Sequence, residues 1–307
     1  MLAGFPGLVF IPNPFTPAAQ RQLIKDCLRT HAVPPAKSNL DALYDLPAQG
    51  LWRLHEQSQI PRKAKTPTVP APDARYSAES TSSTDTHHQL GPPPPASQLA
   101  ANGGAPVGQL VPKLRWVTLG YQYNWSNKEY FLDAPQPFPD DIARLAQTVV
   151  AAIHNIVNGN SQYTQYHTTD SADKGYIHQY SPELFKPEAG VINYYQARDS
   201  LMAHVDRSEI NMTAPLVSLS LGNTAIFVIG DESRDTEPIA LYLRSGDIVC
   251  MCGPRRKAFH GIPRIIENTL PDYLASSETV LAEDPDWSLF GDYMQNARLN
   301  VNVRQVF

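Results

Sequence analysis

Cysteine is scarce in this sequence. Three of the 307 residues are cysteine (Cys27, Cys250 and Cys252), and no two of them have the Cys-x-x-Cys spacing of a zinc site. Three cysteines do not make the disulfide framework of a small secreted domain. We therefore expect free thiols in a reducing compartment, and a protein that is intracellular and not secreted.

Long hydrophobic runs are also missing. No stretch approaches the roughly 20 apolar residues that a membrane-spanning helix needs. The first ten residues lack the basic start of a signal peptide, contain Pro6, and lack the early arginines of a transit peptide. We expect no membrane segment and a location in the nucleus or cytoplasm, with a mitochondrial location left open.

The third feature that the sequence lacks is an excess of positive charge. Its formal net charge is −5 and its pI is about 6.0, which argues against a protein that coats nucleic acids without specificity. This balance leaves room for a local basic patch that binds one folded RNA or one unpaired base. Hydrophobic residues make up 42% of the chain, enough for one core and a small accessory layer.

Large apolar residues are rare between residues 62 and 106. This stretch contains the run Pro92–Pro95 and the pair His87-His88. Such a segment cannot bury enough surface to order itself, so we predict a disordered linker and a solvated histidine pair. The predicted organisation is an N-terminal segment at 1–61, the linker at 62–106 and the main domain at 107–307.

Two segments have the periodicity of amphipathic helices. Thr16 can cap the first helix, with Pro17 in its first turn and apolar residues at helical spacing as far as Leu28. The second helix covers about residues 139–157. We expect both to pack against one face of a sheet, and we expect an irregular acidic connection at 271–292.

The second half of the chain has the pattern of short strands. The apolar runs cover residues 190–195, 215–221, 224–229, 241–243 and 247–252. Gly222-Asn223 and Ser245-Gly246 separate neighbouring runs, which predicts two hairpins. Such strands are typical of an antiparallel sandwich or jelly roll. The predicted fold class is mixed α+β, a double-stranded β-helix (jelly roll) with N-terminal helices bracing one face of the sheet.

His204, Asp206 and His260 form the most informative pattern. In an extended backbone His204 and Asp206 project to one side and Val205 to the other, so both can reach the same ion. The His-x-Asp pair alone also fits a strand-end histidine beside a solvated aspartate. Together with a distant histidine, it supplies the two imidazoles and one carboxylate that suit non-haem Fe(II).

Arg298 and Arg304 lie in an alternating run near the end of the sequence. Both fall on the polar side of the pattern, opposite Leu299, Val301 and Val303. Either arginine alone fits a solvent-facing charge or a structural ion pair. On one face together, they can hold a small dianion. Metal ligands and a dianion clamp indicate an Fe(II)- and 2-oxoglutarate-dependent oxygenase.

Five ordered motifs resemble the AlkB family of dioxygenases. They are Asn193-Tyr194-Tyr195, His204-Val205-Asp206-Arg207-Ser208-Glu209, Ser245-Gly246-Asp247, His260-Gly261-Ile262-Pro263-Arg264 and Arg298-x-Asn300-x-x-x-Arg304. The stretch from Leu114 to Trp125 is similar to the subgroup of the first mammalian AlkB homologue. The resemblance covers residues from about 114 to 307.

The resemblance implies a cofactor site. His204, Asp206 and His260 would bind Fe(II), and O2 and 2-oxoglutarate would be the cosubstrates. The residues implied to bind 2-oxoglutarate are Asn193, Tyr195, Arg298, Asn300 and Arg304. Among these, Arg298 would pair with the distal carboxylate and Arg304 would lie nearer the end that chelates iron.

The resemblance also implies a substrate site. The aromatic stretch at about 114–131 matches the family's lid over the target base, although its alternation fits a core strand equally well. The residues expected to contact the substrate are Arg115, Trp116, Tyr121, Tyr123, Trp125, Ser208, Glu209, Arg255, Arg256 and Lys257. The last three would contact phosphate at the rim of the metal site, although such a triplet is often a solvated loop.

The implied reaction is oxidative demethylation or hydroxylation of a modified nucleobase. We favour tRNA carrying N1-methyladenine or a modified cytosine, because a mildly acidic protein with a local patch suits a folded partner. DNA carrying N6-methyladenine is the second substrate that the resemblance implies. The sequence does not fix the oligomeric state, and we expect a monomer.

Three alternatives stay open. Strand cleavage at abasic sites would use a lysine of lowered pKa, for which Lys113, Lys128 and Lys257 are candidates. A protein side-chain hydroxylase would keep the metal chemistry and dispense with the aromatic stretch. A catalytically silent binding module would have lost a metal ligand or a clamp arginine, and all of these are present.

Overall fold

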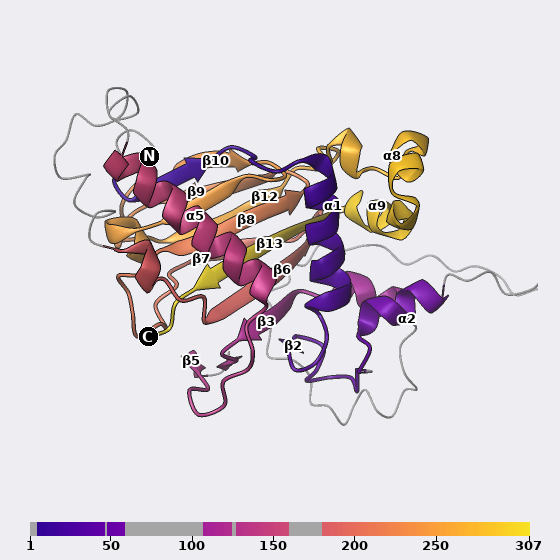
Figure 1. Ribbon diagram of the computed structural model, residues 1–307, viewed down its shortest axis with the longest axis horizontal. Coiled ribbons are helices and arrows are strands. Elements are labelled where there is room, and N and C mark those ends of the chain that lie inside the picture. Colours follow the sequence, from indigo (N-terminus) through magenta and orange to yellow (C-terminus); the bar gives the residue numbers. More distant parts are fainter. Residues whose placement is uncertain (1–4, 47, 59–106, 125–126, 160–179) are drawn as a thin grey trace, which may run out of the picture.

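The computed structural model describes residues 5–46, 48–58, 107–124, 127–159 and 180–307 (Figure 1). The predicted linker at 62–106, its histidine pair and Trp125 lie outside these residues. In the described part of the chain, no helix is long and apolar enough to cross a membrane.

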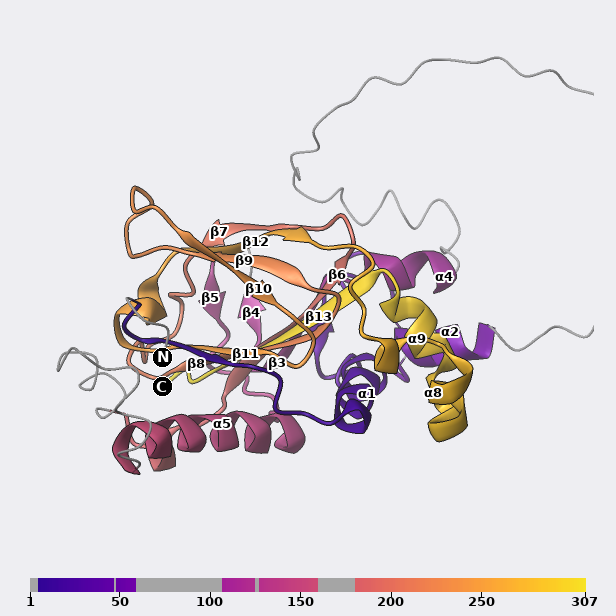
Figure 2. The same ribbon diagram turned by 90° about the horizontal axis from the view of Figure 1, so that it is seen from above.

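Two antiparallel sheets lie face to face at the centre of the molecule (Figure 2). The larger sheet has the order β1 (Leu8–Ile11), β11 (Ile248–Met251), β8 (Leu216–Gly222), β13 (Ala297–Arg304), β6 (Ala189–Gln196), β3 (Trp116–Gly120) and β2 (Lys37–Ser38). The smaller sheet has the order β10 (Ile239–Leu243), β9 (Ala225–Ile229), β12 (His260–Ile265) and β7 (Leu201–His204). The predicted mixture of helices and antiparallel sheets is confirmed.

The space between the sheets holds an apolar core. Both sheets contribute to it, with side chains that include Leu8, Leu216, Phe227, Ile229, Val249, Met251 and Ile262. Because successive side chains of a strand point to opposite faces, the intervening residues of the larger sheet project outward. Leu299, Val301 and Val303 of β13 are examples, and they pack beneath the helices.

Helices cover the outer face of the larger sheet, as predicted (Figures 1 and 2). The helices over this face are α1 (Pro17–Lys25) and α5 (Asp140–Gly159). The helices α2 (Leu51–Ser58), α4 (Val107–Leu110), α8 (Glu278–Glu283) and α9 (Ser288–Met294) lie together at one end of the sheets. The hydroxyl of Thr16 accepts a hydrogen bond from the Ala19 amide at 3.2 Å, which confirms the predicted cap of α1. A π-helical turn at Asp26–Thr30 continues that helix.

The two predicted hairpins are wrong. Strand β8 ends at Gly222 in the larger sheet, whereas β9 begins at Ala225 in the smaller sheet, and β10 and β11 are divided in the same way. Gly222 has a φ of +90°, and a Cβ atom there would lie 2.2 Å from Cε of Met294. The Asn223 amide donates to the carbonyls of Met294 and Ala297, at 2.9 Å each. These turns are therefore corners at which the chain passes from one sheet to the other.

The acidic stretch at 271–292 is more regular than predicted, because it contains α8 and most of α9. Trp287 and Phe290 are fully buried there, with ring centroids 5.7 Å apart. Phe290 also stacks on Trp52 of α2 at 4.7 Å. The helices are short and Pro285 separates them, so the sequence has no long amphipathic pattern.

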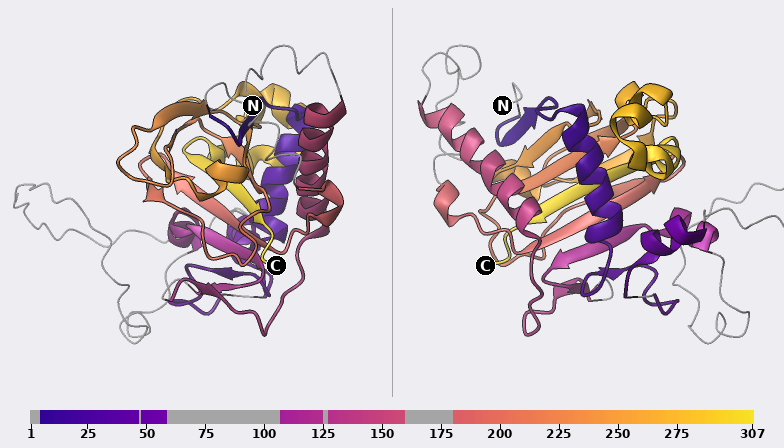
Figure 3. Two further views of the ribbon diagram at one scale, coloured as in Figure 1. Left: turned by 90° about the vertical axis from the view of Figure 1, so that its left-hand side faces the viewer. Right: turned by 45° about the vertical axis from the view of Figure 1, so that its right-hand side comes forward.

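The aromatic stretch at 114–131 divides into two structures. Strand β3 pairs with β6 in the larger sheet, so the core-strand alternative describes residues 116–120. The remainder forms a separate hairpin of β4 (Tyr123–Asn124) and β5 (Glu129–Tyr130). This hairpin lies beyond the β3 edge of the larger sheet, near the C-terminus (Figures 1 and 3).

Candidate metal centre and cosubstrate site

The three predicted metal ligands come together where β7 and β12 meet. His204 ends β7, His260 begins β12, and the two residues are directly opposite each other in the antiparallel pairing. Their ring centroids are 4.5 Å apart. The Asp206 carboxylate lies 3.9 Å from Nε2 of His204 and 3.6 Å from Nε2 of His260. One ligand atom from each residue falls within 4.8 Å of the other two.

Backbone carbonyls fix the orientation of both imidazoles. Nδ1 of His204 lies 2.9 Å from the carbonyl oxygen of Met202, and Nδ1 of His260 lies 3.1 Å from that of Ala258. A carbonyl oxygen can only accept, so Nδ1 carries the proton in both rings. Each Nε2 lone pair is therefore available to a metal on the side of Asp206.

Asp206 provides a direct test of whether the site suits a cation. Its Oδ2 atom is buried and has no hydrogen-bond partner among the described residues. Burying a carboxylate oxygen without a partner is costly, and a bound cation removes this cost. Two imidazoles and one carboxylate form the donor set of non-haem Fe(II) sites, so the residues fit that ion.

The protonation states of the ligands also suit metal binding. Burial alone would raise the pKa of Asp206, but Arg304 and then the two histidines outweigh burial and lower it to about 2. Burial lowers the pKa of His260 to about 4, although the Asp206 charge opposes this shift. At neutral pH the carboxylate is therefore ionised and the His260 imidazole is neutral, as metal coordination requires.

Arg298 is fully buried, and its hydrogen-bond acceptors are all neutral. Its guanidinium donates to the carbonyls of Asn223 and Leu243, at 3.1 and 3.2 Å, and to the Ser220 hydroxyl at 2.7 Å. Among the described residues, no carboxylate lies within ion-pair distance of it, and its Nε atom has no partner. Burial lowers the pKa of Arg298 to about 10. A buried cation of this kind suits the carboxylate of an anionic cosubstrate.

Arg304 lies beside the metal ligands. Its Nη2 atom is 2.8 Å from Oδ1 of Asp206, and its Nη1 atom is 3.6 Å from the Glu209 carboxylate. Nη1 also donates to the Tyr130 hydroxyl at 3.4 Å. Arg304 therefore contacts a predicted metal ligand directly, whereas the hydrogen bonds of Arg298 are with Asn223, Leu243 and Ser220.

The other predicted cosubstrate residues line the same inner face. Strand β13 pairs with β6 so that Arg298 is opposite Tyr195 and Asn300 is opposite Asn193. Burial raises the pKa of Tyr195 to about 12, and the hydroxyl also interacts electrostatically with Arg298 and Asp206. Tyr195 and Asn193 are therefore on the same face of the larger sheet as Arg298 and Asn300.

Two serines of this face were missed in the sequence. The Ser220 hydroxyl accepts from Arg298, and that of Ser218 accepts from the Asn300 amide at 2.9 Å. Both alternate with leucine or valine in strand β8. Hydroxyls at every second position of an apolar strand are a signal that could have identified a polar strip inside the core.

Three of the predicted substrate residues, Tyr123, Ser208 and Glu209, meet beside the metal ligands together with Tyr130. The Tyr123 hydroxyl lies 3.0 Å from Oγ of Ser208. The Tyr130 hydroxyl donates to Glu209 at 2.7 Å. The β4–β5 hairpin therefore contacts the loop that follows Asp206.

Two other predicted substrate residues, Arg115 and Tyr121, have contacts away from the metal ligands. Arg115 forms an ion pair with Asp199 at 2.9 Å. Tyr121 packs against Phe307 with ring centroids 5.5 Å apart. Trp116 is opposite Asn193 in the pairing of β3 with β6, so it belongs to the inner face of the sheet.

The predicted phosphate contact is wrong for two residues of the basic triplet. Arg255 is buried and donates to the carbonyl of Gly230 at 2.6 Å. Arg256 is 1% exposed and is paired with Glu209, so neither Arg256 nor Glu209 is available to a substrate. The short helical turn Gly253–Lys257 directs these two arginines inward and leaves only Lys257 exposed.

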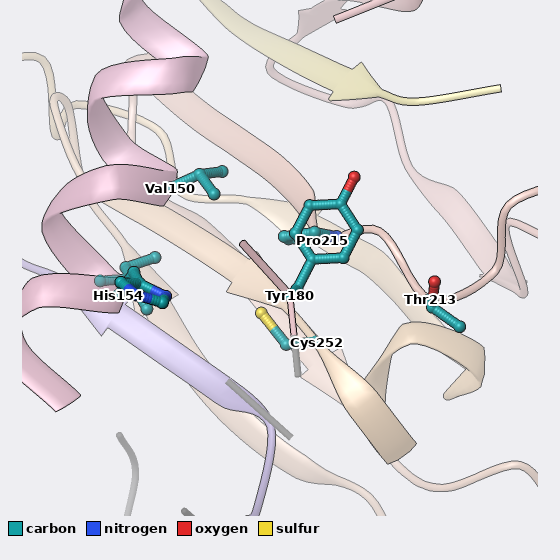
Figure 4. A pocket seen from close by; sticks show the side chains of 7 residues that line it. Val150, His154, Tyr180, Thr213, Pro215 and Cys252 are labelled. Atoms are coloured by element: carbon teal, nitrogen blue, oxygen red, sulfur yellow. The ribbon is translucent and has the colours of Figure 1, made fainter. Parts of the chain in front are cut away.

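A small hollow elsewhere in the molecule does not belong to this site (Figure 4). It lies between α5 and the outer face of the larger sheet, where Val150, His154, Tyr180, Pro215 and Cys252 line it. None of its lining residues is a metal ligand or a clamp arginine, and the larger sheet separates it from the inner face that carries them.

Comparisons with known proteins reveal related sequences. The chain matches the 2OG-Fe(II) oxygenase superfamily over residues 71–304. It is 34% identical to nucleic acid dioxygenase ALKBH1 of Mus musculus, over 99% of this chain and 65% of that protein. It is 35% identical to tRNA demethylase abh1 of Schizosaccharomyces pombe, over 98% of this chain and 79% of that protein. It is 31% identical to DNA N(6)-methyladenine demethylase ALKBH1A of Arabidopsis thaliana, over 98% of this chain and 76% of that protein. The chain thus spans about two thirds of the length of the mouse relative.

Proposed function

Because the chain belongs to the 2OG-Fe(II) oxygenase superfamily, and within it to the AlkB family, we propose that it is an Fe(II)- and 2-oxoglutarate-dependent dioxygenase of modified nucleobases. One observation carries this proposal: a two-histidine, one-carboxylate set shares the interior with a buried arginine whose hydrogen-bond acceptors are all neutral. On this proposal, the two facing sheets are those of a double-stranded β-helix.

The residues divide the work between metal and cosubstrate. His204, Asp206 and His260 would hold Fe(II), and Arg298 would bind the distal carboxylate of 2-oxoglutarate. Arg304, beside Asp206, would orient the end that chelates the metal. Bound Fe(II) would supply the activation of O2 that is coupled to conversion of 2-oxoglutarate to succinate and CO2. The apolar core between the sheets would exclude water from this chemistry.

The substrate would enter beside the β4–β5 hairpin. Tyr123 and Ser208 lie where the hairpin meets the loop after Asp206, and they would contact an unpaired or flipped base. Hydroxylation of an N-methyl group on that base gives a hemiaminal, which releases formaldehyde and leaves the unmethylated base.

For the substrate we propose tRNA carrying N1-methyladenine or a modified cytosine, with N6-methyladenine in DNA as the second candidate. The names of the fission yeast and Arabidopsis relatives support these two classes. The net charge of −5 favours a folded RNA that is recognised by shape over long duplex DNA. We further propose a monomer that works in the nucleus or cytoplasm, with its catalytic domain at 107–307, since all the proposed site residues lie in that range.

No observation favours the lyase alternative. Lys113, Lys128 and Lys257 are all exposed to solvent, whereas an activated lysine is normally desolvated or next to another cation. The silent-module alternative does not explain why two histidines, an aspartate and a buried arginine are kept in this arrangement.

The proposal is tested by loading the protein anaerobically with Fe(II) and 2-oxoglutarate. Air is then admitted with methylated tRNA, single-stranded DNA or duplex DNA, and formaldehyde and succinate are measured together. We expect equal amounts of the two products on one substrate class, and neither product with His204→Ala. His204 is a suitable position because its side chain is partly exposed at a strand end, so the core should tolerate its loss.

Other outcomes would redirect the proposal. Succinate without formaldehyde would keep the oxygenase and move the substrate to a hydroxylated base or a protein side chain. A His204→Ala protein that makes succinate at the wild-type rate would refute the metal assignment. Absence of both products with iron bound would refute the proposed reaction.

A further inference from the structure

A buried ion pair lies behind the metal ligands, and the proposed reaction gives it no role. Nη2 of Arg256 is 2.9 Å from Oε2 of Glu209, and both side chains are 1% exposed. Breaking such a pair is strongly destabilising, although replacing both partners by apolar residues is often neutral. Both partners also contact residues that the proposed reaction does use, Asp206 and Arg304.

Arg256 fixes the loop that contains the metal ligand. Beyond its pairing with Glu209, its guanidinium donates to the carbonyl of Asp206 at 2.6 Å and to that of Ala214 at 3.2 Å. The three guanidinium nitrogens of Arg256 thus connect Asp206 and Glu209, near the start of the loop at 206–214, with Ala214 at its end. Because the Asp206 carbonyl is one of the acceptors, the backbone position of the carboxylate ligand depends on Arg256.

Glu209 extends this arrangement to the aromatic hairpin. Its Oε2 atom faces Arg256, while its Oε1 atom accepts from the Tyr130 hydroxyl at 2.7 Å and lies 3.6 Å from Arg304. Arg304 in turn contacts both the Tyr130 hydroxyl and the Asp206 carboxylate. We call these five residues, Asp206, Glu209, Arg256, Arg304 and Tyr130, the Asp206 cluster.

Tyr130 is the member of the Asp206 cluster that belongs to the hairpin. Its ring packs edge-on against Tyr123 at 5.2 Å, and the Tyr123 hydroxyl reaches Ser208. Two carboxylates and two guanidiniums make the rest of the cluster formally neutral. The Tyr130 hydroxyl therefore keeps its position through two hydrogen bonds, one to Glu209 and one from Arg304, and not through attraction to a net charge. A small movement of the hairpin can break both hydrogen bonds.

We propose that Tyr130 and Glu209 are positioning residues that couple occupancy of the β4–β5 hairpin by the nucleic acid to the alignment of Asp206 and Arg304. The inference rests on the proposed function. A base held against the hairpin fixes the Tyr130 hydroxyl, which holds Glu209 and Arg304 and through them the carboxylate ligand. Consumption of 2-oxoglutarate is then matched to oxidation of the substrate.

The test replaces Tyr130 by phenylalanine, which removes the hydroxyl and keeps the ring against Tyr123. We expect the ratio of formaldehyde to succinate to fall several-fold from about one, because 2-oxoglutarate is consumed without oxidation of the base. The matched control is Tyr242→Phe, which removes an exposed hydroxyl from β10. The control should keep the wild-type ratio.

A second readout uses the metal-free protein and no turnover. The Lys128 amide donates to Asn124 and the Phe131 amide donates to Gln122, at 2.8 and 2.9 Å. We expect hydrogen exchange at both amides to become faster in Tyr130→Phe and to stay unchanged in Tyr242→Phe.

A third variant, Glu209→Gln, keeps an acceptor for the Tyr130 hydroxyl but removes the negative charge that faces Arg256 and Arg304. It should therefore also disturb Asp206 and weaken Fe(II) binding.

These outcomes separate the inference from the proposed function. A wild-type protein that makes neither product would refute the proposed function, and the exchange experiment would still test whether Tyr130 holds the hairpin. A Tyr130→Phe protein with an unchanged product ratio, or with both products reduced equally, would overturn the inference, because equal losses indicate a structural role alone.

Discussion

The buried guanidinium of Arg298 donates hydrogen bonds to two carbonyls and one hydroxyl, all of which are neutral. If a carboxylate of 2-oxoglutarate completes this set, Arg298→Lys should raise the KM for 2-oxoglutarate. Complete loss of the charge-assisted pair would cost roughly 1.5–3 kcal/mol, which corresponds to about a 10- to 150-fold increase. Because lysine keeps the charge, we expect an increase near or below the lower end of this range. Initial rates of succinate formation at varied 2-oxoglutarate would measure it.

The lysine variant keeps the positive charge and removes the two-pronged geometry of the guanidinium. Arg264→Lys on β12 is a matched control, because this arginine is exposed. An unchanged KM in Arg298→Lys would remove Arg298 from the cosubstrate site.

Individual residues differ in how far the sequence could predict them. The sequence predicts that His204, Asp206 and His260 lie together, because two imidazoles and one carboxylate form a metal-binding set, and the structure brings them within 4.8 Å of one another. Arg256 and Glu209 were assigned to the substrate because their position in the motif is near the site. The sequence gives no signal that their side chains turn inward and pair with each other, since a basic triplet has the same letters in a solvated loop.

Gly222 occupies the corner at which the chain leaves the larger sheet. Its φ of +90° and the nearby Cε of Met294 both oppose a side chain there. We expect Gly222→Ala to lower the free energy of unfolding by roughly 1–3 kcal/mol. Gly108→Ala is the control, since a Cβ at Gly108 would meet nothing within 4 Å. Urea unfolding of both variants would measure the difference, and equal stabilities would contradict this account of the corner.

At the level of elements, periodicity predicted the helices and strands better than their pairing. The runs at 190–195 and 215–221 are strands β6 and β8, and the second predicted helix is α5. Alternation shows which face of a strand is buried but not which strand lies next to it. Gly222-Asn223 has the letters of a hairpin turn, and only the contacts of Asn223 with Met294 and Ala297 show that it is a corner.

The whole molecule should become more stable when its site is filled. Mn²⁺ can stand in for Fe(II) without turnover, and a ligand at 100 times its Kd adds about 2.7 kcal/mol to the free energy of unfolding. For a protein of this size we expect a rise in Tm of roughly 5–10 °C with Mn²⁺ and 2-oxoglutarate. Differential scanning calorimetry would measure it.

Two variants separate the contributions to this rise. Arg298→Lys should lose the part that depends on 2-oxoglutarate and keep the part that depends on Mn²⁺. His204→Ala should lose both parts, because 2-oxoglutarate would chelate the metal. A full rise in Tm with His204→Ala would show that the ligands bind elsewhere in the molecule.

The central position of β13 has a consequence for how this protein is made. Strands β6 and β8 are synthesised well before β13, yet in the finished sheet β13 lies between them and pairs with both. Until residues 297–304 emerge from the ribosome, β6 and β8 each have one edge without a partner strand. Arg298 and Arg304 are then also absent from the inner face of the sheet. Open edges in a nascent chain invite pairing with other chains. The growing polypeptide therefore depends on β13 for protection of these two edges from aggregation, and chaperones that shield strand edges should associate with it until β13 is in place.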